Sequence, residues 1–149
     1  MKPKTEFNQN KALHSLAVAD FMRTWAPVLK LNPDHAWIIG YVHDVGCVNG
    51  SIGHSINGYN MMVGLSKELA HYISIHDNGG HIKNDMEFLL KLADYSIDHE
   101  GNLVGISERK KRMSLRDGVD VSKAVENQLN ILEEYARSNG YIELYNLCS

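Results

Sequence analysis

Apolar residues recur at helical spacing along almost the whole chain, and this periodicity is the feature that most constrains the fold. They are spaced three and four residues apart in one segment after another, while no segment alternates convincingly with period two and β-branched runs are few. An α-helix places residues i, i+3, i+4 and i+7 on one face, so each such segment predicts a helix with one buried side. The sequence therefore predicts an all-α protein, a compact bundle of about six to seven helices.

Turn-forming residues separate the expected helices. Helices are expected over residues 8–26, 34–44, 54–65, 66–76, 85–97 and 121–138. The stretch 48–53 is rich in glycine and polar residues, which favours a loop, and Gly46 is expected to end the helix before it. In the next helix the residues expected on the buried side are His54, Gly58, Met61, Met62 and Leu65.

The length and composition fit one globular domain. With 149 residues, of which 44% are hydrophobic, the chain can bury a sizeable core. We expect a single domain over residues 1–149, with its core over about 8–98 and a C-terminal helical extension over about 119–147.

Charge and cysteine content limit the partners and the compartment. The net charge is −3 and 22% of residues are charged, so no broad basic field exists and duplex nucleic acid is not an expected partner. Small anionic substrates suit this charge, and a homodimer is compatible with the sequence. Only Cys47 and Cys148 are present, with no secretory segment, which argues against a disulfide framework and for the cytoplasm. No apolar run reaches the roughly 18 residues of a membrane span, so no membrane partner is expected.

Ionisable residues interrupt the predicted buried faces repeatedly. The chain has eight histidines, and they concentrate between His14 and His99. One such residue has an ordinary structural explanation, but burying several costs several kcal/mol each unless they are paired or bind metal. The residues at or within one turn of a predicted buried face are His14, His43, Asp44, His54, His76 and Asp94. Imidazole and carboxylate groups suit zinc, iron or manganese, so a metal site is predicted if these side chains converge.

The order of these residues resembles that of the HD-domain phosphohydrolase superfamily. That family has a histidine, then a His-Asp pair, then a later aspartate, and the chain presents these in the segments 13–19, 41–46 and 92–95. The resemblance covers residues 13–97 or so. It implies an HD domain that binds divalent metal and hydrolyses a phosphoester or phosphoanhydride bond.

By the same resemblance, the ligands divide between two ions. The first ion would be held by His14, His43, Asp44 and Asp94, and the second by Asp44, His54 and His76. Asp44 would bridge the two, with His43 and Asp44 at the catalytic centre and a metal-bound hydroxide as the nucleophile. For His54 and His76 the alternative is helix capping or substrate binding. Iron or manganese is favoured, and zinc, cobalt, nickel or magnesium are compatible.

Two residues depart from the patterns of related proteins and indicate which branch of the family the chain resembles. Cys47 follows the His-Asp-Val-Gly run where many relatives have lysine or another polar residue. Asp77 follows His76 where the cyclic-dinucleotide phosphodiesterase branch has a second histidine, and that branch's Gly-Tyr-Pro signature is absent. The layout is more similar to small stand-alone nucleotide hydrolases, including bacterial diadenosine tetraphosphatases, which implies a nucleotide as the phosphorylated substrate.

Residues outside the ligand set are harder to assign. The candidates for substrate phosphate contact are His81, Lys83 and Arg109, each of which also fits an ordinary solvated side chain. The basic run 108–112 is expected to be a solvated loop or helix surface. Asp98 is expected either to orient a metal ligand or to be a surface carboxylate.

Two other functions stay open at this point. A few HD-fold proteins use the same six ligands in a mixed-valence di-iron centre that activates oxygen, so an oxygenase is one alternative. The other is a non-catalytic regulatory domain that binds a nucleotide or a partner. The mark expected of such a domain, a missing ligand, is not found in the chain.

Overall fold

The computed structural model describes residues 4–49, 53–77, 79–117 and 119–149, and this part of the chain is almost entirely helical. The elements are α1 (Lys4–Trp25), η1 (Ala26–Leu29), α2 (Pro33–Val42), η2 (Val45–Asn49), α3 (His54–Met62), α4 (Lys67–Ile75), α5 (Asp85–Ser96), α6 (Ile106–Asp117), α7 (Val119–Asn139) and α8 (Ile142–Cys148). Here η1 and η2 are 3-10 helices, and the described residues form no strand, only an isolated bridge between Ile97 and Leu103. The all-α prediction is confirmed.

The described residues contain eight α-helices, more than the six to seven expected. The basic run 108–112 belongs to a regular helix, α6, and a further short helix, α8, follows Gly140. Gly140 has a φ of 82°, a left-handed conformation that glycine adopts without steric cost, so one helix can end and another begin there.

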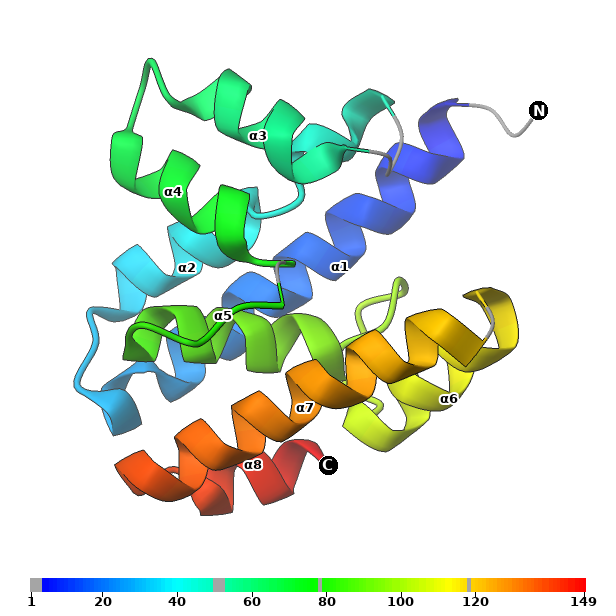
Figure 1. Ribbon diagram of the computed structural model, residues 1–149. Coiled ribbons are helices and arrows are strands. Elements are labelled where there is room, and N and C mark those ends of the chain that lie inside the picture. The colour runs from blue at the N-terminus through cyan, green and yellow to red at the C-terminus, as the bar shows by residue number, and fades with distance from the viewer. Residues whose placement is uncertain (1–3, 50–52, 78, 118) are drawn as a thin grey trace.

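The helices lie in three tiers in Figure 1, with α3 and α4 at the top, α1, α2 and α5 in the middle, and α7 and α8 at the bottom. The hairpin of α1 and α2 is closely packed at Gly40, where a Cβ atom would lie 2.9 Å from the Cα of Ala19. Glycine therefore lets the two backbones approach.

Buried apolar residues, most of them from the middle and bottom tiers, form one cluster. Its members include Val18, Met22, Ile39, Phe88, Leu89, Leu92, Leu132 and Leu144. The central helix α5 is buried from Met86 to Ala93 without interruption, as expected for a helix with neighbours on several sides. Its C-terminal end is thereby fixed within the bundle.

Side-chain caps determine where three helices begin. Asn32 accepts a hydrogen bond from the His35 amide at the start of α2, Ser66 from the Leu69 amide at α4, and Asn84 from the Glu87 amide at α5. Each cap satisfies an amide that has no partner within its helix.

Several local predictions about the segment around α3 are wrong. Gly46 has no positive φ and lies within η2, so it does not end the helix before it through a left-handed turn. Residues 48–49, expected in a loop, also belong to η2, and 50–52 lie outside the described residues. Met61 and Leu65 are 47% and 82% exposed, because α3 packs through the close approach of Gly58 to Gly46 rather than through an apolar stripe.

None of the helices in the described part of the chain combines the length and the apolar character needed to cross a membrane.

Candidate metal centre

The six predicted ligands come together where several helices begin or end. His43 and His76 are the C-terminal caps of α2 and α4, His54 opens α3, Asp94 lies near the end of α5, Asp44 follows His43, and His14 projects from the middle of α1. Helix packing therefore brings residues up to 80 positions apart into contact, as between His14 and Asp94.

The first group of side chains is formed by His14, His43, Asp44 and Asp94, whose ligand atoms all lie within 4.8 Å of one another. Asp94 Oδ1 is 2.9 Å from His14 Nε2 and 3.3 Å from His43 Nε2. Asp44 Oδ2 is 3.4 Å from His43 Nε2. Two ligands bound tetrahedrally at ~2.1 Å from one ion are ~3.4 Å apart, so these spacings fit a single bound cation.

The second group consists of Asp44, His54 and His76. The Nε2 atoms of His54 and His76 are 3.0 Å apart, and Asp44 Oδ1 lies 3.5 Å from the first and 3.3 Å from the second. Asp44 thus turns Oδ2 to the first group and Oδ1 to the second. Its carboxylate lies between the two groups and is shared by both.

Backbone carbonyls orient three of the histidines. Nδ1 of His14 bonds to the Asp98 carbonyl at 3.0 Å, and Nδ1 of His43 and His76 bonds to the Gly40 and Ile73 carbonyls, each at 2.6 Å. A carbonyl oxygen only accepts, so each Nδ1 carries the hydrogen and the lone pair of a neutral ring is at Nε2. Because Nε2 faces the centre, each ring is held in the tautomer that binds metal.

The centre is buried and strongly coupled electrostatically. His14, His43 and His76 are 1%, 0% and 1% exposed. Burial would lower the pKa of His43, but the carboxylates of Asp44 and Asp94 outweigh it and raise that pKa well above its usual value. Burial would raise the pKa of both carboxyls, but His43 above all holds both well below the usual range. Both aspartates are therefore ionised and surrounded by groups that suit a cation.

Lys11 is a residue of the site that the sequence analysis missed. Its Nζ lies 3.2 Å from Asp44 Oδ2, so an ammonium group already provides positive charge beside the shared carboxylate. Because the Lys11 ammonium group already binds Asp44, the position beside this carboxylate suits positive charge, which is consistent with a divalent ion held by the ligand groups. The signal was present in the sequence, because Lys11 precedes His14 by three residues and so lies on the same face of α1.

Asp98 orients a ligand through its backbone rather than through its carboxylate. Its carbonyl binds His14, while its carboxylate accepts hydrogen bonds from the amides of Glu100 and Asn102 at 3.0 and 2.9 Å. Arg112 pairs with the same carboxylate at 3.1 Å. The side chain thus orders the loop that presents the carbonyl.

The three candidates for substrate contact have different environments. His81 and Lys83 are exposed between α4 and α5, outside both ligand groups, and the Lys83 amide donates to Glu87 at 2.9 Å. Arg109 is only 7% exposed, so the prediction that the whole basic run is solvated is wrong at this position. Its helix, α6, turns this side chain inward, where its charge acts on Tyr95, the neighbour of Asp94.

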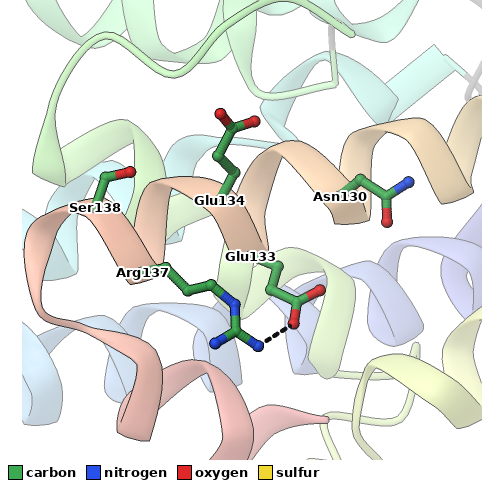
Figure 2. Close-up of a pocket in the computed structure, with 5 residues that line it drawn as sticks. All are labelled: Asn130, Glu133, Glu134, Arg137 and Ser138. Carbon is green, nitrogen blue, oxygen red and sulfur yellow. Dashed lines mark hydrogen bonds and ion pairs between the residues drawn. The ribbon is translucent and has the colours of Figure 1, made fainter.

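Two hollows on the surface of the protein lie apart from the ligand groups. Figure 2 shows one along α7, where Arg137 donates to Glu133 at 2.8 Å. It is lined by Asn130, Glu133, Glu134, Arg137 and Ser138. Another is lined by Leu31, His35, Glu68, Tyr72, Asn84, Asp85, Met86 and Tyr135. Neither contains a member of either ligand group.

Comparison with known proteins identifies the family. The HD domain family matches residues 12–140, which is most of the chain. A Ribonuclease Y from Oleidesulfovibrio alaskensis is 28% identical over 102 residues, covering 63% of this chain and 19% of that protein. The chain thus spans about a fifth of that relative's length. No solved structure matches the chain significantly. The match over residues 12–140 and the helical fold show that the chain belongs to the HD domain family, a superfamily of metal-dependent phosphohydrolases.

Proposed function

We propose that this protein is a phosphohydrolase that uses two divalent ions, iron or manganese, to cleave a phosphoester or phosphoanhydride bond in a small nucleotide. The observation that carries the proposal is the position of Asp44, whose two oxygens face two separate ligand groups. Two ions bridged in this way suit phosphoryl transfer, because one stabilises the attacking oxygen and the other the leaving oxygen.

The protein's own residues have distinct roles in this proposal. Bound divalent ions would supply an activated water at neutral pH and neutralise charge on the phosphoryl group. His14, His43 and Asp94 hold the first position, with their orientation set by packing and by backbone carbonyls. Lys11 is 21% exposed beside Asp44, so its ammonium group can reach a phosphate oxygen once Asp44 binds metal.

The charge of the chain supports a small nucleotide as the substrate, and the related protein supports the type of bond that is cleaved. The net charge of −3 leaves no broad basic field for a duplex, whereas two ions and one lysine suffice for one phosphate chain. The related Ribonuclease Y is by its name an enzyme that acts on RNA, whose backbone bonds are phosphoesters. Arg109, His81 and Lys83 stay candidates for contacts beyond the reacting phosphate.

The test is hydrolysis by the metal-loaded chain in oxygen-18 water without oxygen gas. Mononucleotides, dinucleoside polyphosphates and short RNA oligonucleotides are supplied in turn with manganese or ferrous iron. We expect metal-dependent turnover with one label in a phosphate-bearing product, and loss of turnover in Asp94→Asn. Turnover that stops without oxygen gas would contradict the proposal and favour a di-iron oxygenase, and absence of turnover with all three classes would contradict it as well.

A further inference from the structure

A carboxylate outside both ligand groups lies beside the second one. Asp77 follows His76 at the end of α4, and its Oδ2 is 3.5 Å from His54 Nε2. Asp44 Oδ1, the shared ligand atom, lies at the same distance from the same nitrogen. The contact is made with Nε2, the nitrogen that faces the centre, so Asp77 lies on the metal side of the ring and not behind it.

Ser55 orients this carboxylate in the metal-free protein. Its hydroxyl donates to Asp77 Oδ1 at 2.6 Å, which leaves Oδ2 directed at His54. Ser55 and His54 are adjacent in the first turn of α3, so the start of one helix positions a ligand and a neighbouring carboxylate together.

The charge of Asp77 also acts on the interior of the protein. Lys91 is fully buried on α5, 3.8 Å from Glu87. Burial lowers the pKa of Lys91, and the negative charges of Glu87 and Asp77 partly offset that effect. Asp77 is therefore close enough to α5 for its charge to act on Lys91, although 45% of the Asp77 side chain is exposed.

We propose that Asp77 is a further ligand of the ion at the second position, which would then have two carboxylates and two imidazoles. The inference rests on the two-ion function proposed above. Asp77 is not among the three residues whose ligand atoms all lie within 4.8 Å of one another, so its side chain has to turn toward the ion on binding. Its exposure leaves room for that rotation.

A second carboxylate would change which metal this position prefers. Carboxylate oxygens suit manganese and magnesium, whereas zinc binds well to imidazole nitrogens and needs only about four ligands. With Asp77, the second position favours manganese over zinc. Without it, two imidazoles and the shared Asp44 remain, a set that zinc tolerates better.

Metal titration of the full chain tests the assignment without relying on activity. Metal-free wild type, Asp77→Asn and Ser55→Ala are titrated with manganese and with zinc by calorimetry. We expect wild type to bind two manganese ions, and Asp77→Asn to bind the second about tenfold or more weakly, the loss seen when a supporting group at a metal site is removed. The first ion should bind unchanged, the second zinc should lose less affinity than the second manganese, and Ser55→Ala should shift the same step by less.

Asp34→Asn is the matched control, because the Asp34 side chain is 86% exposed and pairs with the surface residue Arg23 at 3.3 Å, outside both ligand groups. It should bind both ions as wild type does. Equal second-ion affinity in Asp77→Asn and wild type would overturn the inference, and so would equal weakening of both ions or a wild type that binds a single ion. Two ions in wild type and a selective loss in Asp77→Asn, together with no hydrolysis, would instead refute the phosphohydrolase proposal and leave Asp77 as a ligand.

Discussion

Replacing Gly46 with alanine is expected to remove the second ion and leave the first. Gly46 lies in η2 against the start of α3, and a Cβ atom there would be 1.9 Å from the His54 carbonyl oxygen and 2.5 Å from the Gly58 amide nitrogen. Both neighbours are backbone atoms, so no side-chain rotation relieves the clash. To reach even a 3.0 Å contact, η2 and the start of α3 must separate by about 1.1 Å.

That displacement is large compared with the tolerance of a metal site. Metal–ligand distances vary by only ~0.2 Å, so a shift of His54 by several times that amount takes its Nε2 out of reach of an ion that Asp44 still holds. Three ligands of the first ion, His14 on α1, His43 at the end of α2 and Asp94 on α5, lie outside the two segments that clash. The same overpacking should cost ~1–3 kcal/mol of stability, which lowers Tm by roughly 2–12 °C.

Elemental analysis and manganese calorimetry of the purified variant measure the effect, with thermal denaturation of the metal-free chain as a check on folding. Gly64→Ala is the control, because a Cβ atom at Gly64 meets nothing within 4 Å and the change is chemically identical. It should bind two ions. The reasoning is refuted if Gly46→Ala retains both ions with the affinity of wild type, or loses the first before the second.

Three further predictions concern the ligands and their surroundings. Asp44→Asn should lose both ions and all turnover, whereas His76→Ala should retain about one ion and turn over much more slowly than wild type. Elemental analysis that finds one ion in both variants would contradict a shared role for Asp44. Lys11→Gln should lower kcat/KM by ~10- to 100-fold, the effect of losing one hydrogen bond between charged groups, at unchanged metal content. Lys11→Arg should retain more activity, and equal kinetics in Lys11→Gln and wild type would argue against a phosphate contact. Burial lowers the pKa of His43 but its aspartate neighbours raise it well above the usual value, so the metal-free ring is protonated at neutral pH. Metal must displace that proton, so the affinity for metal should rise with pH until the pH exceeds the raised pKa of His43. Calorimetry in buffers of different ionisation enthalpy should detect the release of a proton on metal binding. If no proton is released, the pKa of His43 is not raised.

Local features of the sequence were enough to predict the fold class and the positions worth examining. Helical spacing of apolar residues depends only on the chain's immediate neighbours, and the described part of the chain is all-α as expected. The six interrupting residues were recognisable because a His or Asp in an apolar stripe is costly without a partner. The structure brings all six into two groups, and their binding of metal stays a prediction.

Other features were decided by packing between helices. Lys11 meets Asp44 across 33 positions, and Asp77 approaches His54 only because the start of α3 lies against the end of α4. Neither contact is a property of spacing within one helix. Arg109 was expected in solvent and is buried because α6 packs that side inward.

The sequence by itself thus determined the all-α class, most of the helices and the six ionisable residues that interrupt their apolar faces, since all of these follow from a repeat of 3.6 residues per turn. Only the tertiary structure decided that Asp44 is shared between two groups, that Gly46 is needed for a close backbone approach, and that Lys11 and Asp77 adjoin the centre. The physical reason is that periodicity is local to each helix, whereas distances of 3 to 4 Å between ligand atoms depend on how separate helices cross and where each one ends.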